Sequence, residues 1–147
     1  FYIGYNGIKQ QNIYSFHISI PEKTGYNNSG LRENQKQEIY EKLLNAMVSN
    51  KLFTNPTLSL QNLSDMLSIP PHHITQTLNE FVKQNFYDFV NSYRVNEFKK
   101  RVDQGDSERF SLLGIALDCG FNSKSSFNRI FKNTTGFTPS EYRLIQI

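Results

Sequence analysis

The chain has 147 residues, of which 37% are hydrophobic and 20% charged, and its formal net charge is +3. This composition predicts a folded domain, but so small a positive charge does not by itself identify a nucleic-acid partner. The single cysteine, Cys119, excludes an internal disulfide and a zinc site made of thiolates, and we expect a cytoplasmic location.

Residues 1–30 differ in character from the rest of the chain. They are rich in aromatic residues and glycine, they include the loop-like stretch PEKTGYNNSG, and they show no clear helical period. We therefore interpret 1–30 as an accessory or juxtamembrane arm and expect the folded domain to occupy 31–147.

The segment 31–52 has the pattern of an amphipathic helix. Ile39, Leu43 and Met47 recur at four-residue spacing and form a broad apolar stripe. Such a stripe either packs into the domain or mediates dimerisation, and the sequence leaves both alternatives open.

The next two segments predict a helix-turn-helix and then a longer helix. Ser59 is a suitable N-cap, Pro71 suits the first position of a second helix, and the unit covers roughly 59–84. A longer helix over roughly 86–104 would then span about 28 Å at the α-helical rise per residue.

The same pattern returns near the carboxyl end, over roughly 111–135. Ser111 and Ser123 are suitable N-caps, Gly120 can supply a left-handed turn, and Pro139 begins a short final helix. The sequence thus predicts an all-α fold of about seven helices, with two helix-turn-helix units joined by a linker helix.

The second helix of each unit has a polar outer face. In the later unit a helical wheel places Ser125, Asn128, Arg129 and Lys132 opposite the apolar face, with Lys124 at its edge. Arg can bind guanine through two hydrogen bonds and Asn can bind adenine, so this face suits DNA bases and phosphates.

The outer face of the earlier unit is less cationic. It carries His72, Gln76, Asn79 and Lys83, with Thr75 at the margin, while the nearby carboxylate of Glu80 disfavours phosphate. Successive major-groove faces of DNA recur about 34 Å apart, and a linker of about 28 Å can hold two reading helices near that interval.

The stretch GFNSKSSFNRIFKNTTGFTPSEYR resembles the carboxyl-terminal signature of AraC-type transcription regulators. LLGIALDCG, LSLQNLSDMLSIPPHHITQTLNE and NFYDFVNSYRV are similar to further parts of that family's DNA-binding domain, and the likeness covers about 37–143. The resemblance implies a bacterial, sequence-specific, double-stranded DNA-binding regulator whose two units occupy adjacent major grooves. It implies DNA contacts by His72, Thr75, Gln76, Asn79, Lys124, Ser125, Ser126, Asn128, Arg129 and Lys132.

The first unit departs from the family pattern at three positions. The family favours Gly where Ser68 stands, Ser where Pro70 stands, and Gly where Lys83 stands. Loss of the Ser cap is worth roughly 1 kcal/mol, which Pro71 partly offsets. These departures concern the turn geometry and the pose of the second helix in this unit, whereas the later unit fits the family pattern far better.

The resemblance also bears on partners and location. YNNSGLRENQKQEIYEKLLNAM is similar to AraC-type proteins whose DNA-binding part follows membrane-spanning helices, so one hypothesis is a cytoplasmic part tethered by an upstream segment. The alternatives for 1–30 are a disordered arm and a piece of a sensor domain. The further partners we expect are RNA polymerase and a second copy bound through the 31–52 helix.

We find no pattern of an enzyme or of a cofactor site. His72 and His73 lack further metal ligands beside them, Cys119 lacks a neighbouring base, and there is no phosphate-binding loop or dinucleotide fingerprint. The alternative to a DNA-binding domain is therefore a helical protein-interaction or dimerisation module.

Overall fold

The structure is a computed structural model that describes residues 31–146. The hypotheses about the arm at 1–30 lie outside these residues. The described chain contains α-helices and two short 3-10 helices, η1 and η2. In chain order they are α2 (Glu33–Val48), η1 (Leu52–Thr54), α3 (Leu60–Leu67), α4 (Pro71–Phe81), α5 (Phe86–Asp103), η2 (Asp106–Glu108), α6 (Leu112–Asp118), α7 (Lys124–Thr135) and α8 (Pro139–Gln146).

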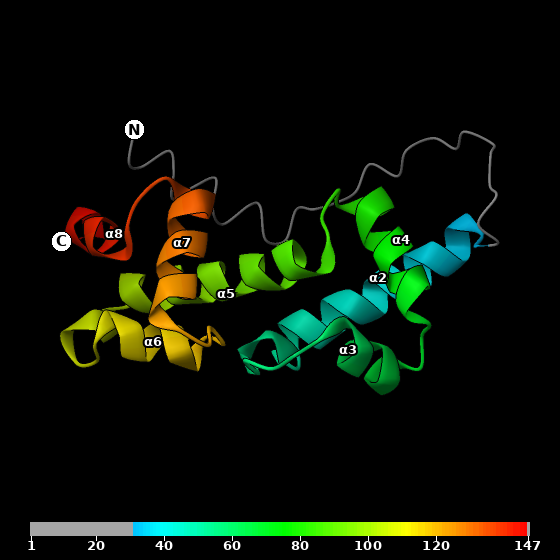
Figure 1. Cartoon of the computed structure of the whole chain (residues 1–147), viewed down its shortest axis with the longest axis horizontal. Coiled ribbons are helices and arrows are strands. Elements are labelled where there is room, and N and C mark those ends of the chain that lie inside the picture. The colour runs from blue at the N-terminus through cyan, green and yellow to red at the C-terminus, as the bar shows by residue number, and fades with distance from the viewer. Residues whose placement is uncertain (1–30, 147) are drawn as a thin grey trace.

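The described residues form seven α-helices and no strand, so the predicted all-α class is confirmed. The helix pair α3–α4 falls in the predicted first unit, α6–α7 falls in the second, and α5 is the linker helix between them. Figure 1 shows α4 and α7 near opposite ends of α5, with their axes running in the same general direction. Within 31–146, no helix is both long and apolar enough to cross a bilayer.

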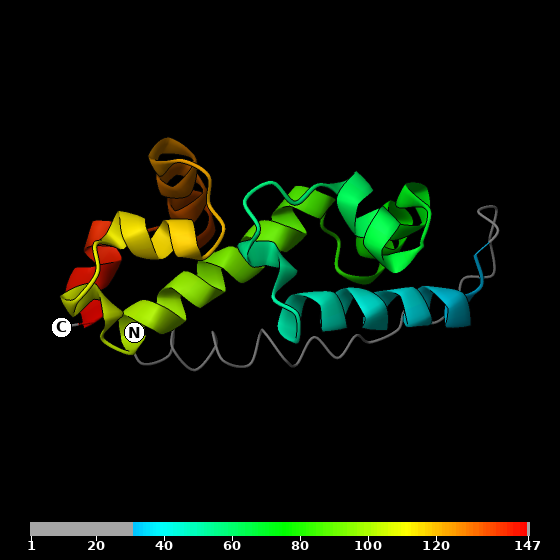
Figure 2. The same cartoon turned by 90° about the horizontal axis from the view of Figure 1, so that it is seen from below.

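Two separate hydrophobic cores stabilise the two ends of the molecule. The first gathers side chains from α2, α3, α4 and the start of α5, and the second gathers α6, α7 and α8 on the later part of α5. Phe89 and Val90 belong to the first core, whereas Val95 and Phe98 belong to the second. Figure 2 shows the same division, with α2 beneath α3 and α4 at one end of α5 and α6 to α8 at the other.

The apolar stripe of α2 is part of the first core. Ile39, Leu43 and Met47 are buried, and α2 packs mainly on α4. The hypothesis that this stripe mediates dimerisation is therefore wrong, because α4 and the rest of the first core already cover its side chains.

Candidate nucleic-acid interface

Helix α7 is anchored by its aromatic face and begins at a well-formed cap. The Ser123 hydroxyl oxygen accepts a hydrogen bond from the backbone N–H of Ser126 at 3.2 Å. Phe127 and Phe131 are buried against Phe98 of α5, with ring centroids 4.8 and 5.2 Å apart. This packing fixes the rotation of α7 about its axis and turns its polar face outward.

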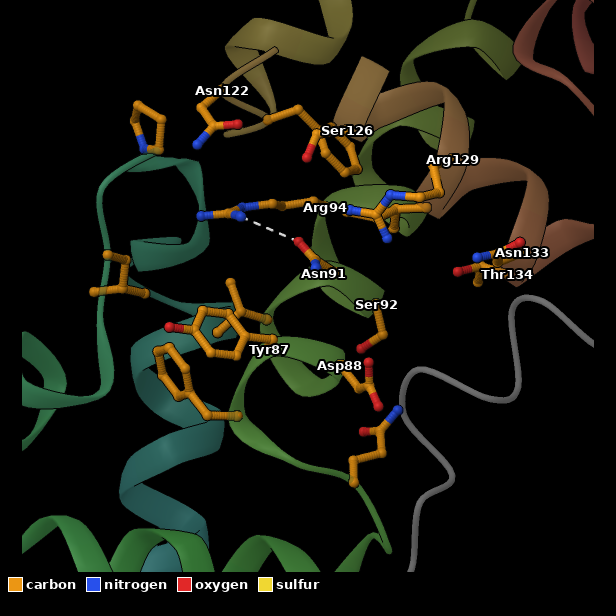
Figure 3. A pocket seen from close by; sticks show the side chains of 17 residues that line it. Tyr87, Asp88, Asn91, Ser92, Arg94, Asn122, Ser126, Arg129, Asn133 and Thr134 are labelled. Atoms are coloured by element: carbon orange, nitrogen blue, oxygen red, sulfur yellow. Dashed lines mark hydrogen bonds between the residues drawn. The ribbon is translucent and has the colours of Figure 1, made fainter. Parts of the chain in front are cut away.

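The polar face of α7 consists of two neighbouring stripes. Ser125, Asn128 and Lys132 are exposed along one of them. Ser126, Arg129 and Asn133 form the other, which lines a cleft between the two units (Figure 3). Lys124 is exposed at the start of the helix. Every residue predicted to contact DNA from α7 is therefore at the surface.

Helix α4 is held in the same manner by Ile74 and Leu78, which are buried. On its other side His72 and Asn79 are exposed, while Thr75 and Gln76 are half-buried. The predicted contact residues of this helix are also at the surface, although two of them are more enclosed than those of α7.

The carboxylate that sequence analysis placed on the α4 face is neutralised by a lysine from α2. The Lys36 ammonium lies 2.6 Å from one oxygen of Glu80 and 3.1 Å from Glu33, and Lys36 is only 3% exposed. The Gln76 amide N–H donates to the other Glu80 oxygen at 2.9 Å. The ion pair of Lys36 and Glu80 therefore joins α2 to α4, in addition to leaving a carboxylate on the α4 face.

This network keeps both charges in place at neutral pH. Burial alone would raise the pKa of Glu80, but the hydrogen bonds from Lys36 and Gln76 lower it below its usual value. Burial likewise acts to lower the pKa of Lys36, whereas its hydrogen bonds to Glu80 and Glu33 raise it. The negative charge of Glu80 on α4 is thus offset by the buried positive charge of Lys36 from α2, which reduces the repulsion of phosphate by Glu80.

The cleft between the units has a volume of about 550 Å³ and polar walls. Its floor is the first half of α5, including Asn91 and Ser92, and one wall is the cleft stripe of α7 (Figure 3). Asn122 also lines it, from the turn before α7. Sequence analysis did not select Asn122 or Asn133, although Asn133 lies one turn from Arg129 and could have been found by that spacing.

The structure gives neither Cys119 nor the His72–His73 pair the surroundings of a reactive or metal-binding group. Cys119 is 1% exposed, and burial raises its pKa to about 12, so the thiol is protonated at neutral pH. The rings of His72 and His73 lie 4.3 Å apart at their centroids, but no group of three His, Cys, Asp or Glu residues that could hold a metal occurs within 31–146.

Comparison with known proteins identifies the family. A family model described as a helix-turn-helix domain matches residues 63–144, which is more than half of the chain. The chain belongs to this family. Its fold is that of the AraC-type DNA-binding domains. The match runs from α3 to α8 and so includes α4 and α7, the second helix of each unit.

Solved structures show the same fold. A Listeria innocua protein of unknown function has a TM-score of 0.63 and 30% identity, with 73% of this chain and 96% of that chain covered. A transcriptional regulator from Chromobacterium violaceum, from the AraC-type DNA-binding domain-containing proteins, has a TM-score of 0.59 and 18% identity, with 77% and 93% covered.

Among curated relatives, an uncharacterized HTH-type transcriptional regulator of Staphylococcus aureus is 32% identical over 93 residues, which is 63% of this chain. The aligned part of the AraC-type domain spans 12% of that regulator's length. The probable transcription factor PqrA of Proteus vulgaris is 26% identical over 96 residues, which is 65% of this chain and 76% of PqrA.

Proposed function

We propose that this chain binds double-stranded DNA in a sequence-specific manner and regulates transcription, with α4 and α7 in adjacent major grooves. The observation that carries the proposal is that two anchored helices present exposed hydrogen-bond donors near the two ends of a single helix. The family match and the regulators among its relatives support the same function. The proposal assigns DNA binding to 31–147 and gives the chain no catalytic role.

The linker helix supports this arrangement by its length. The 18 residues of α5 span about 27 Å at 1.5 Å per residue. One part of it packs in each core, and the two reading helices run in the same general direction. Because successive major-groove faces are about 34 Å apart, one face of a duplex can meet both helices.

The two helices contribute differently to binding. On α7 we assign base contacts to Asn128 and Arg129 and phosphate contacts to Lys124, Ser125, Ser126 and Lys132. On α4, where Glu80 and Lys36 balance each other, we assign contacts to His72, Thr75, Gln76 and Asn79. We expect α4 to add more to sequence preference than to electrostatic affinity.

Fluorescence anisotropy on duplexes selected from a random library tests the proposal. Arg129→Ala should lower the preference for selected over scrambled duplex by about 1–3 kcal/mol, because a base contact is lost. Lys132→Ala should weaken binding to all duplexes alike and reduce the slope of log K against log salt by about 1. Lys42→Ala, which removes an exposed lysine from α2, is the charge-matched control and should change neither quantity.

Two outcomes would contradict the proposal. A parent chain that enriches no sequence from the library does not read DNA bases. Parent-like binding by both Arg129→Ala and Lys132→Ala would mean that α7 does not present its polar face to the duplex.

Regulation requires partners besides DNA, and we propose contact with RNA polymerase through surfaces that the duplex leaves open. A second copy of the chain would have to dock on a surface other than the buried stripe of α2.

A further inference from the structure

Arg94 lies on α5 where the first hydrophobic core gives way to the second. Its guanidinium donates from Nε to the Phe53 carbonyl at 2.7 Å and from Nη2 to the Asn55 carbonyl at 2.9 Å. The third nitrogen, Nη1, donates to the Asn91 side-chain oxygen at 3.1 Å. Arg94 therefore fastens η1 and the segment after it, which precede the first unit, onto the linker helix, and Phe53 packs in the first core.

The second unit meets the same point through Gly120, in the turn between α6 and α7. Gly120 is buried and has a φ of +111°. A Cβ atom there would overlap the Phe53 carbonyl oxygen and come within 2.7 Å of Arg94 Nε. The glycine thus allows the α6–α7 turn to rest directly on the carbonyl that Arg94 holds. We call the contact of Phe53, Arg94 and Gly120 the junction.

The junction can affect how the two units are oriented, because the two hydrophobic cores are separate. Each core fixes one reading helix relative to its own part of α5, but neither core fixes the η1 segment against the α6–α7 turn. We propose that Arg94 is a positioning residue that sets the angle between α4 and α7, and with it the spacing of the two DNA half-sites that the chain accepts. This inference rests on the proposed function.

The geometry of arginine suits this role better than that of lysine. Two backbone carbonyls from residues two apart are reached by different nitrogens of one planar group. Lysine has a single ammonium and cannot reproduce the fork. Three of the five guanidinium N–H groups of Arg94 donate to protein oxygens, so the chain itself fixes where this side chain lies. We therefore assign Arg94 an effect on DNA binding through the position of the units.

Distances between the units test the first half of the proposal. Spin labels at Asp65→Cys on α3 and Ser140→Cys on α8 occupy exposed positions at opposite ends of the molecule, and buried Cys119 stays unlabelled. Pulsed dipolar spectroscopy should give a narrow distance distribution for the parent and a broad or shifted one for Arg94→Met. An unchanged distribution in Arg94→Met overturns the proposal.

The matched control is Arg101→Met. Arg101 lies on the same helix and binds Asp106 and Asp118 at 2.6 and 3.2 Å, and neither of these partners belongs to the first unit. Its loss should leave the distance between the units unchanged. If Arg101→Met broadens the distribution as much as Arg94→Met, the junction has no special role and the proposal fails.

Selection from a duplex library tests the second half. Arg94→Met should enrich the same half-sites as the parent but at varied spacings. It should bind a two-half-site duplex at least tenfold more weakly and a single half-site within twofold of the parent. A parent-like spacing overturns the proposal, and so does an equal loss on single half-sites, which would make Arg94 a DNA contact.

A second variant, Arg94→Lys, distinguishes a change in the angle between the units from a failure to fold. Arg94→Lys keeps the charge and the aliphatic stem, and it should broaden both the distance and the spacing distributions while melting cooperatively. If Arg94→Lys folds and matches the parent in both measurements, the proposal is overturned. If the parent enriches no sequence, the proposed function fails, while the spin-label distances still decide whether the junction sets the angle.

Discussion

The two helix-turn-helix units share an architecture but differ in how their turns are made. In the second unit the two residues with positive φ are Gly120 and Gly136, and the Ser123 side chain caps the reading helix. In the first unit the corresponding positions are Ser68 and Lys83, at φ of +56° and +57°. There the N-cap residue before the second helix is Pro70, which makes no side-chain cap hydrogen bond.

The difference shows that long-range packing can hold a turn that local preferences disfavour. A left-handed conformation costs a non-glycine residue about 1–2 kcal/mol. In the first unit this cost is offset by neighbouring contacts: the Ser64 hydroxyl donates to the Ile69 carbonyl across the turn, and α2 covers α4. The first unit therefore depends on α2, whereas the second carries its own local signals.

The largest effect on stability should come from Gly120, because neighbouring atoms already occupy the space that a Cβ would need. Gly120→Ala should destabilise the fold by about 3 kcal/mol, since it combines a positive φ with overlap against the Phe53 carbonyl. Gly136→Ala is the matched control, because its φ is +83° but nothing lies within 4 Å of the added Cβ, and it should cost about 1 kcal/mol. Urea unfolding measures both, and equal losses would show that the junction is not tightly packed.

The next largest difference in stability should come from the N-terminal caps of α7 and α4. Ser123→Ala removes the hydrogen bond to the Ser126 N–H and should cost about 1 kcal/mol. Pro70→Ser gains such a cap but loses the rigidity of proline in the unfolded chain, so its net change should stay within about 0.5 kcal/mol. A large gain from Pro70→Ser in thermal unfolding would mean that the first unit simply lacks an optimal cap.

Glycine at the two left-handed positions should stabilise the first unit. Ser68→Gly and Lys83→Gly each remove the strain of a side chain at positive φ, and each should raise stability by about 0.5–1 kcal/mol after the entropy cost of glycine. Ser49→Gly is the control, because its φ of −84° offers nothing to relieve, and it should destabilise. If the Tm falls in all three variants, Ser68 and Lys83 are not strained.

The smallest effect concerns the charge on α4. Glu80→Gln removes a carboxylate near the proposed DNA face and should raise affinity for a mixed-sequence duplex about two- to fivefold at low salt. Glu41→Gln is closely matched, because Glu41 also accepts from a glutamine four residues earlier, Gln37, but lies on the outer side of α2. Anisotropy across a salt range should show the gain only for Glu80→Gln, and an equal gain for both would place α4 outside the interface.

The sequence by itself determined the helices and the faces they present. The caps Ser59, Ser111 and Ser123 and the spacing of apolar residues specified where each helix begins and which side it buries. These are short-range effects, because hydrogen bonds to N–H groups three residues away and a 3.6-residue period both act within one or two turns. The polar face of α7 could therefore be predicted before any packing was known.

Only the tertiary structure decided which groups meet between helices. Lys36 pairs with Glu80 across 44 residues, and Arg94 reaches the Phe53 carbonyl across 41. The burial of the α2 stripe and the cleft beside Arg129 likewise depend on how α2, α5 and α7 pack. Such contacts depend on the relative placement of whole helices, and residue spacing along the chain does not specify it.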